Sequence, residues 1–210
     1  QAGDIAASAI SEVIHGTTIA TNAILEHRGV KTGLITTLGF RDVLEIRRLR
    51  MPKLYDLTWQ KPKPLAARAD RAEVTGRIDH QGNVLTPLDE GSVVAAIEKL
   101  LDNRVEAIAV CLINAYANGD HERRIGELIS ARAPDLPVCL SSEILPEIKE
   151  YERTSTAVVN AYILPVVGQY LTALSASLER LGVTAPLLVM QSSGGAMGVG
   201  AACLRPIHII

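Results

Sequence analysis

Apolar residues along the chain recur in two alternating patterns. Short runs rich in β-branched and aliphatic residues predict strands, and longer segments with apolar residues at three- and four-residue spacing predict helices. The predicted strands cover residues 11–14, 31–37, 105–113, 137–141 and 186–191, and the predicted helices cover 17–28, 39–48, 89–101, 118–129 and 146–181. Alternation of strands and helices is typical of an α/β fold with a mixed, mainly parallel sheet.

Local signals refine this outline. Asp89 is expected to cap a helix, and Asn118 or Asp120 to open the next one. Runs 73–79 and 84–87 flank Gly82, which predicts an inserted hairpin. The strands at 11–14 and 31–37, joined by one helix, predict a parallel βαβ unit. Residues 4–8 fit the tail of a helix, and the proline-containing run 49–71, where basic residues outnumber acids, predicts an exposed loop.

Two prolines are expected to shape the last long helical segment. Pro146 is expected in its first turn, where a missing N–H costs nothing, followed by acidic residues that the helix dipole favours. Pro165 is expected to bend or break the helix, because it lacks a backbone donor. The second piece is expected to end at Gly182.

The stretch 13–23 predicts a strand, a tight turn at Gly16 and a helix running to about Arg28, where Gly29 would stop it. Thr17 or Thr18 is expected to cap this helix. The free N–H groups at a helix start attract an anion, and His15 next to them suits a general base or a phosphate contact. The alternative is a buried strand, a threonine cap and a histidine that is only hydrogen-bonded.

A second polar loop, Ser192 to Gly195, also follows a predicted strand. It resembles an anion-binding nest, although it lacks the Gly-Lys-Ser/Thr of a P-loop and the Gly-x-Ser-x-Gly of a nucleophile elbow. The alternative is a simple turn. Because ligands gather beyond the carboxyl ends of strands in open α/β sheets, we expect the His15 turn and the Gly194-Gly195 turn to face one shared crevice.

Acidic residues are dense between 147 and 154. Glu147 and Tyr151 are expected to share a helix face, as are Glu150 and Thr154. Paired carboxylates suit a metal or acid–base chemistry, and the alternative is helix capping with an exposed acidic face. The other histidines show no metal-ligand spacing with one another or with cysteine, so we expect no zinc site.

Composition narrows the class of protein. The chain of 210 residues suits one large or two small domains, and its net charge of −2 does not favour nucleic acid. No apolar run has the length of a membrane span, and no signal peptide is evident. Cys111 and Cys139 lie in apolar runs, which predicts buried thiols in a reducing, cytoplasmic compartment. A first residue other than Met and an apolar last run, 207–210, suggest a fragment of a longer protein.

Several motifs together resemble the hydantoinase A/5-oxoprolinase family. They recur in the family's order over nearly the whole chain, at 15–23, 39–46, 141–147, 150–156, 160–162 and 190–195. The resemblance implies an actin/hexokinase-like (ribonuclease H-like) ATPase core. It also implies a division into an N-terminal region, 1–145, and the start of the hydantoinase A core domain, 146–210, with a helix pair, a strand and a Gly-rich loop.

The resemblance further implies ATP-dependent opening of a cyclic amide of the hydantoin or 5-oxoproline type. ATP would phosphorylate the carbonyl oxygen, Mg²⁺ would neutralise the transferred charge, and a nucleophile would then attack. Alternatives within and outside the family are the ATP-using subunit of an acetone or acetophenone carboxylase and a non-catalytic α/β assembly module. A sugar kinase of the same superfold is favoured less, because the motifs match the hydrolases.

The implied site residues fall into two groups. The catalytic candidates are His15, Thr17, Thr18 and Glu147. The candidates for substrate or phosphate binding are Gly16, Thr21, Asn22, Arg41, Asp42, Arg153, Gln191, Ser192, Gly194 and Gly195. The implied partners are a small cyclic amide and either further copies of the chain or a hydantoinase B-type subunit, with no nucleic acid and no membrane.

The family's two phosphate-binding motifs do not occur in this sequence. The family opens with an Asp-Ile-Gly-Gly-Thr-type hairpin and carries a second Gly-Gly-Thr loop further on, and neither is present here. We therefore expect these residues alone neither to bind ATP tightly nor to turn over. Titration calorimetry that found micromolar ATP binding to this chain would contradict that expectation.

Overall fold

The computed structural model describes residues 6–48, 55–56 and 58–210. Contacts divide the chain into two compact units. One unit combines Gln1–Gly29 with Ile163–Ile210, and the other is Val30–Tyr162. The first unit is therefore discontinuous in sequence, whereas the predicted division near residue 145 was continuous. That prediction concerned family regions, and it stays a prediction.

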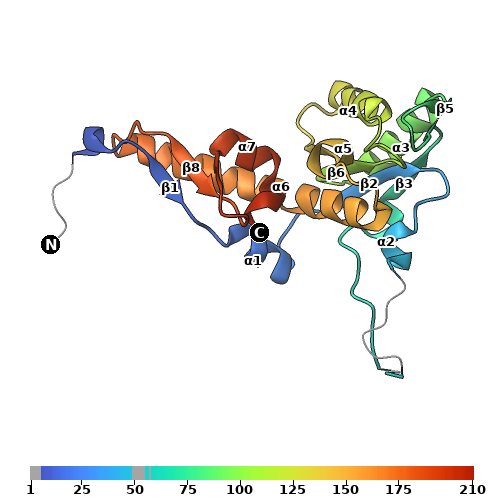
Figure 1. Ribbon diagram of the computed structural model, residues 1–210, viewed down its shortest axis with the longest axis horizontal. Helices are drawn as coiled ribbons and strands as arrows, with labels where there is room; N and C mark the ends of the chain where they lie inside the picture. Colours follow the sequence, from blue (N-terminus) through green and yellow to red (C-terminus); the bar gives the residue numbers. More distant parts are fainter. Residues whose placement is uncertain (1–5, 49–54, 57) are drawn as a thin grey trace. The chain divides into compact units, whose positions relative to one another are not determined.

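The unit Val30–Tyr162 is built on a four-stranded parallel sheet (Figure 1). Its strands are β2 (Thr32–Thr37), β3 (Arg71–Val74), β6 (Ala107–Cys111) and β7 (Val138–Leu140), in the order β3-β2-β6-β7. Leu34 lies opposite Arg71 on one side and Ala109 on the other. All residues of β2 and β6 are buried, as expected for parallel strands covered on both faces.

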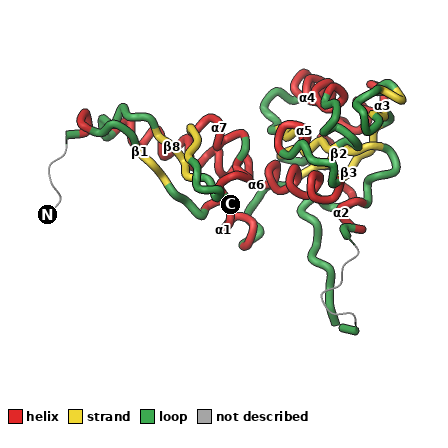
Figure 2. The backbone as a smooth tube through the Cα atoms, in the orientation of Figure 1, coloured by secondary structure: helices red, strands yellow, loops and turns green. Residues whose placement is uncertain are grey.

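Helices cover both faces of this sheet (Figures 1 and 2). Ile35, Ile108 and Val110 pack against α3 (Glu90–Asp102) and α4 (Asp120–Arg132). The alternate residues Leu34, Ala109 and Cys111 pack against α2 (Val43–Ile46), α5 (Ser141–Ile144) and the first part of α6 (Glu150–Arg180). The period of two along the strands therefore separates two hydrophobic clusters, and the predicted α/β architecture is confirmed.

The hairpin is present but shorter than predicted. Strands β4 (Arg77–Ile78) and β5 (Val84–Thr86) are antiparallel, and Gly82 takes φ +89° in the turn. The predicted strand 73–79 splits in two, because its first part belongs to β3 and pairs with β2. The short 3-10 helix η2 (Arg68–Asp70) precedes β3. Of the predicted loop 49–71, residues 49–54 and 57 lie outside the described residues.

The other unit holds a three-stranded sheet in the order β1-β8-β9. Strand β1 (Val13–His15) runs parallel to β8 (Leu187–Met190), and β8 is antiparallel to β9 (Ala196–Gly198). The helical segments are η1 (Ala7–Ala9), α1 (Ile19–Leu25), α7 (Val199–Leu204), η3 (Pro206–Ile209) and the second part of α6. Residues 4 and 5 of the predicted N-terminal helix lie outside the described residues.

The predicted βαβ unit of β1, α1 and β2 was wrong. Strand β1 pairs with β8, more than 170 residues away in sequence, whereas β2 pairs with β3 and β6 in the other sheet. The burial patterns explain the difference: β2 is buried throughout, but Ile14 in β1 is 54% exposed. Adjacency in sequence is a weak guide when a distant strand offers a better partner.

Helix α1 ends earlier than predicted, at Leu25 rather than Arg28. His27 takes φ +54°, a left-handed conformation that stops the helix and that Gly29 had been expected to supply. The N–H of Arg28 then donates to the carbonyl of Ala23.

Helix α6 corrects the prediction for Pro146 and the predicted break at Pro165, whereas a bend at Pro165 stays a prediction. It begins at Glu150, so Pro146 lies in the preceding connection rather than in the first turn. It continues unbroken through Pro165 to Arg180. A proline inside a helix costs about 3 kcal/mol, and the complete burial of Ile163, Val167 and Leu171 supplies packing that offsets this cost.

Helix α6 also has the length and composition of a membrane span, with 31 residues and a mean hydropathy of 1.4 in its most apolar window. This finding corrects the expectation that no segment of the chain meets those criteria. Forty-four per cent of that window is buried within the protein. Val158 and Ala161 pack against the four-stranded sheet, as core helices of α/β folds do.

Candidate functional site

The pairing of β1 with β8 brings two of the predicted polar turns to one edge of the smaller sheet. His15 lies opposite Val189, so both strands end at this edge, and the segments that follow are His15 to Thr18 and Gln191 to Gly195. The shared crevice predicted from sequence stays a prediction, but the backbone places both turns at this one edge of the sheet. We call it the β1–β8 edge.

His15 has a tyrosine partner at this edge. Its Nε2 lies 2.8 Å from the hydroxyl of Tyr170 in α6, and the two ring centroids are 5.7 Å apart. Both side chains are half-buried. Within the described part of the chain, Nδ1 of His15 has no hydrogen-bond partner. The ring is therefore held at one nitrogen, and the other remains available.

The hydrogen bonds that the two threonines make at the start of α1 differ from the predicted capping. Thr18 is the N-cap residue of α1, but its side chain makes no capping bond. Thr17 Oγ1 accepts a hydrogen bond from the N–H of Ile19 at 3.2 Å, and Thr18 Oγ1 accepts one from Asn22 Nδ2 at 3.3 Å. Because α1 has only seven residues, its dipole contributes little to anion binding. The predicted anion site at the helix start gains no support.

A hollow of about 450 Å³ opens beside α1. It is lined by Thr17, Thr18, Ile19, Asn22, Ala23, Glu26, Arg28 and Val166. Arg28 Nε and Glu26 Oε2 form an exposed ion pair of 3.1 Å. Three predicted site residues thus face a space of the size of a small-molecule pocket, but its lining does not include the turn 191–195.

The turn 191–195 is the connection of the β8–β9 hairpin. Gly194 takes φ +91°, which a glycine adopts without strain. The N–H of Gly194 donates to Gln191 O, and the N–H of Gln191 donates to Gly195 O. Both the N–H and the hydroxyl of Ser192 donate to the carbonyl of His208. These donors hold the turn itself, so the simple-turn alternative describes the backbone, and anion binding here stays a prediction.

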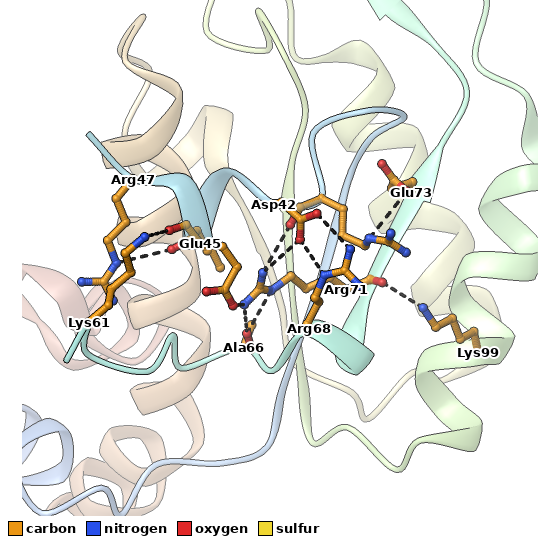
Figure 3. A network of polar contacts seen from close by, with 11 residues as sticks. Asp42, Glu45, Arg47, Lys61, Ala66, Arg68, Arg71, Glu73 and Lys99 are labelled. Carbon is orange, nitrogen blue, oxygen red and sulfur yellow. Dashed lines mark hydrogen bonds and ion pairs between the residues drawn. The ribbon is translucent and has the colours of Figure 1, made fainter. Parts of the chain in front are cut away.

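In the unit Val30–Tyr162, Asp42 is tied into a network of ion pairs (Figure 3). Arg68 donates to both carboxylate oxygens of Asp42, at 2.9 and 3.0 Å. The hydrogen bond from Arg68 and the nearby guanidinium charges hold the pKa of Asp42 below its usual range. Arg41 lies close by, with Nε 3.9 Å from Glu73 and without a hydrogen bond. This arrangement favours a structural role for Asp42.

Arg71 is the buried centre of this network, as Figure 3 shows. Its guanidinium is fully buried, donates twice to the carbonyl of Ala66, and reaches Glu45 at 2.8 Å. Lys99 donates to the backbone carbonyl of Arg71 at 2.9 Å. Sequence reasoning missed Arg71, because nothing local distinguishes a buried arginine from an exposed one.

The acidic residues between 147 and 154 are arranged differently from the prediction. Glu147 is exposed and lies before α6 begins, so it does not share a helix face with Tyr151. Glu152 pairs with Arg48, which lowers the pKa of Glu152. Among the described residues, no group of three His, Cys, Asp or Glu side chains is placed to hold a metal ion. A catalytic role for Glu147 stays a prediction.

Arg153 is the residue of the cluster with the most unusual surroundings. It is fully buried, donates from Nη2 to the carbonyl of Leu112 at 2.7 Å, and lies over the ring of Tyr116. Its Nε and Nη1 are buried without a hydrogen-bond partner. A buried guanidinium with two unused donors is costly, and an anionic group would satisfy it. The guanidinium is fully buried, and the phosphate-binding role implied for Arg153 stays a prediction.

A buried carboxylate, Glu122, was also missed. It accepts hydrogen bonds from the N–H groups of Leu112 and Ser142, both at 2.8 Å, and from the hydroxyl of Ser141 at 2.6 Å. Burial raises its pKa despite these donors. Glu122 ties the ends of β6 and β7 to α4, so its role is structural.

The structure thus defines an α/β protein with polar residues at the carboxyl ends of parallel strands. Residues 1–133 match the model of the hydantoinase/oxoprolinase N-terminal region, and residues 153–210 match the hydantoinase/oxoprolinase model. The chain belongs to the hydantoinase/oxoprolinase family.

Relatives with known names support this placement. Caprolactamase subunit alpha of Pseudomonas jessenii is 41% identical over 87% of this chain, and the match covers 26% of that protein. The crystal structure of the ATP-dependent caprolactamase from the same organism has a TM-score of 0.88 and 37% identity, covering 98% of this chain and 30% of that one.

Nucleotide-free acetone carboxylase is a further structural neighbour. It has a TM-score of 0.85 and 25% identity, covering 96% of this chain and 31% of that one. The two structural likenesses are consistent with the actin/hexokinase-like fold. The chain spans less than a third of the length of the relatives it matches.

Proposed function

We propose that the whole protein to which this chain belongs opens a cyclic amide in an ATP-dependent reaction. Family membership and the likeness to an ATP-dependent caprolactamase support this proposal. The observation that carries it is the parallel pairing of β1 with β8, which sets His15 at a strand end beside a second polar turn. Strand ends of this kind are the usual ligand sites of open α/β sheets.

The chemical problem is the stability of the amide. Its oxygen is a poor leaving group, and phosphorylation converts it into a good one; bound ATP would supply the phosphoryl group. Within this chain, His15 would contact the developing negative charge at the β1–β8 edge. Arg153, with two unused donors, would hold an anionic group. Mg²⁺ bound together with ATP would neutralise the charge of the transferred phosphoryl group.

We further propose that the whole protein has a partner subunit and is located in the cytoplasm. One relative is named as a subunit, which favours a partner subunit for the whole protein as well. Cys111 and Cys139 are free and buried, as predicted. Burial raises the pKa of both thiols, that of Cys139 to about 12, which suits unreactive cysteines in a reducing cytoplasm.

The test is to express the full-length protein, together with any neighbouring partner subunit, and to measure ADP release. We expect caprolactam, 5-oxoproline or a hydantoin to stimulate ADP release and to be ring-opened in equal amount. ADP release without any stimulation by these amides would contradict the proposal.

The acetone carboxylase likeness supports a second candidate, the ATP-using subunit of a ketone carboxylase. The same assay separates the two functions. Stimulation by a small ketone that requires bicarbonate, with no response to cyclic amides, would favour the carboxylase. No stimulation by either class would favour the non-catalytic assembly module.

A further inference from the structure

The contact between Tyr170 and His15 addresses a question that the proposed function leaves open, namely whether the imidazole acts as a base or as a donor. The Tyr170 hydroxyl lies 2.8 Å from Nε2, within hydrogen-bonding distance. A neutral imidazole carries one proton, so the partner at one nitrogen determines what the other nitrogen can do.

Both partners sit on rigid elements. His15 is the last residue of β1 and pairs with Val189, which is fully buried. Tyr170 lies next to Leu171 and one turn after Val167, and both of these α6 residues are fully buried. The two side chains are therefore held in position by the sheet and by the core, as a preorganised site requires.

The direction of the hydrogen bond follows from the chemistry of the two groups. A basic imidazole nitrogen accepts more strongly than a phenol oxygen, and the phenol carries a proton to donate. We propose that Tyr170 is a positioning residue: its hydroxyl donates to Nε2 of His15 and thereby keeps the ring proton on Nδ1. This inference rests on the proposed function for the role of His15.

The consequence is a specific role for the imidazole. With its proton on Nδ1, neutral His15 presents a hydrogen-bond donor at the nitrogen that has no partner among the described residues. Such a donor suits an anionic oxygen, for example on a phosphoryl group or a phosphorylated amide, and it excludes general-base chemistry at Nδ1.

The first test reads the tautomer directly. The full-length protein, labelled with ¹⁵N in histidine, is compared with Tyr170→Phe, and the His15 signals are assigned by their loss in His15→Ala. We expect the protonated-type signal on Nδ1 in the wild type and a shift of the proton toward Nε2 in Tyr170→Phe. Tyr162→Phe, which removes a hydroxyl from the same helix, is the matched control and should leave the spectrum unchanged.

The second test is kinetic. Removal of a group that orients a metal-bound histidine typically lowers activity about tenfold to 100-fold. By analogy, we expect Tyr170→Phe to lower kcat about tenfold, with little change in KM. In the His15→Ala background, Tyr170→Phe should add no further loss, because it acts through His15.

The two tests distinguish a failure of the inference about Tyr170 from a failure of the proposed role of His15. An unchanged His15 spectrum in Tyr170→Phe, or an equal kinetic loss in both backgrounds, overturns the inference about Tyr170 alone. Full turnover in His15→Ala overturns the role of His15 in the proposed function, and the donor role with it. A shifted tautomer together with a loss confined to the wild-type background supports both.

Discussion

The β1–β8 edge and the Asp42–Arg71 network both gather polar residues, but they use them in opposite ways. In the network, Asp42 is bound by Arg68 through both oxygens, and Arg71 is bound to Glu45 and Ala66. At the edge, His15 has one partner, and its second nitrogen has none among the described residues. A satisfied cluster stabilises the fold, whereas a held but incompletely bonded side chain is able to bind a ligand.

The largest expected effect is that of His15→Ala in the full-length protein. Loss of a positioned acid–base or electrostatic group costs about 100-fold in turnover, so we expect a loss of that order in amide-stimulated ADP release. The melting temperature should change little, because His15 is only half-buried. Steady-state kinetics and calorimetry check both quantities, and equal losses in both would favour a purely structural histidine.

The second effect is on stability rather than on chemistry. Arg71→Ala removes a fully buried guanidinium and leaves the carbonyl of Ala66 without its two donors. Orphaned buried partners cost about 3 kcal/mol. Denaturant unfolding should show a loss of that size, and kcat per folded molecule should stay unchanged. A selective loss of kcat would move this cluster into the active machinery.

A smaller loss of stability is expected from a substitution in the turn of the β8–β9 hairpin. Gly194→Ala places a side chain at φ +91°, which costs about 1 kcal/mol. Gly195→Ala is the matched control, because its new methyl group would meet the movable side-chain oxygen of Gln191. Thermal unfolding of the two variants measures the difference. An equal loss in both variants would contradict the assignment of the Gly194→Ala loss to its left-handed backbone.

The smallest effect is that of Arg68→Ala, since both Arg68 and Asp42 are solvent-accessible. Arg68 lowers the pKa of Asp42, so the pair stabilises the fold above the ordinary pKa of 3.8 and loses this contribution as the pH falls below it. At neutral pH we expect almost no change in melting temperature, whereas acid unfolding should become less steep. An identical acid profile in the variant would exclude this ion pair as a source of the pH dependence.

Much of the fold was accessible from local pattern. The strand at 105–113, the hairpin around Gly82 and the Asp89 cap, which accepts from Gly91 at 3.0 Å, were predicted and are confirmed. These features depend on neighbours within a few residues. The partner of β1 and the uninterrupted course of α6 through Pro165 were not predicted, because both depend on distant packing.

The residues of the candidate site likewise fall into those that the sequence indicated and those that only the structure revealed. His15, Thr17 and Gly194 stand out in the sequence because they belong to motifs at strand ends. Tyr170, 155 residues from His15, carries no local signal and becomes visible only through the hydrogen bond between them. Asp42 looked like a ligand-binding residue, and its commitment to Arg68 appears only once η2 lies beside α2.

The order of amino acids thus specified the alternation of strands and helices, the turns and the family motifs, since these arise from short-range periodicity and backbone preference. Three-dimensional packing settled which strands pair, which charges neutralise one another and which nitrogen of His15 has a partner among the described residues. Those outcomes depend on contacts between residues far apart in the chain, and no local pattern encodes them.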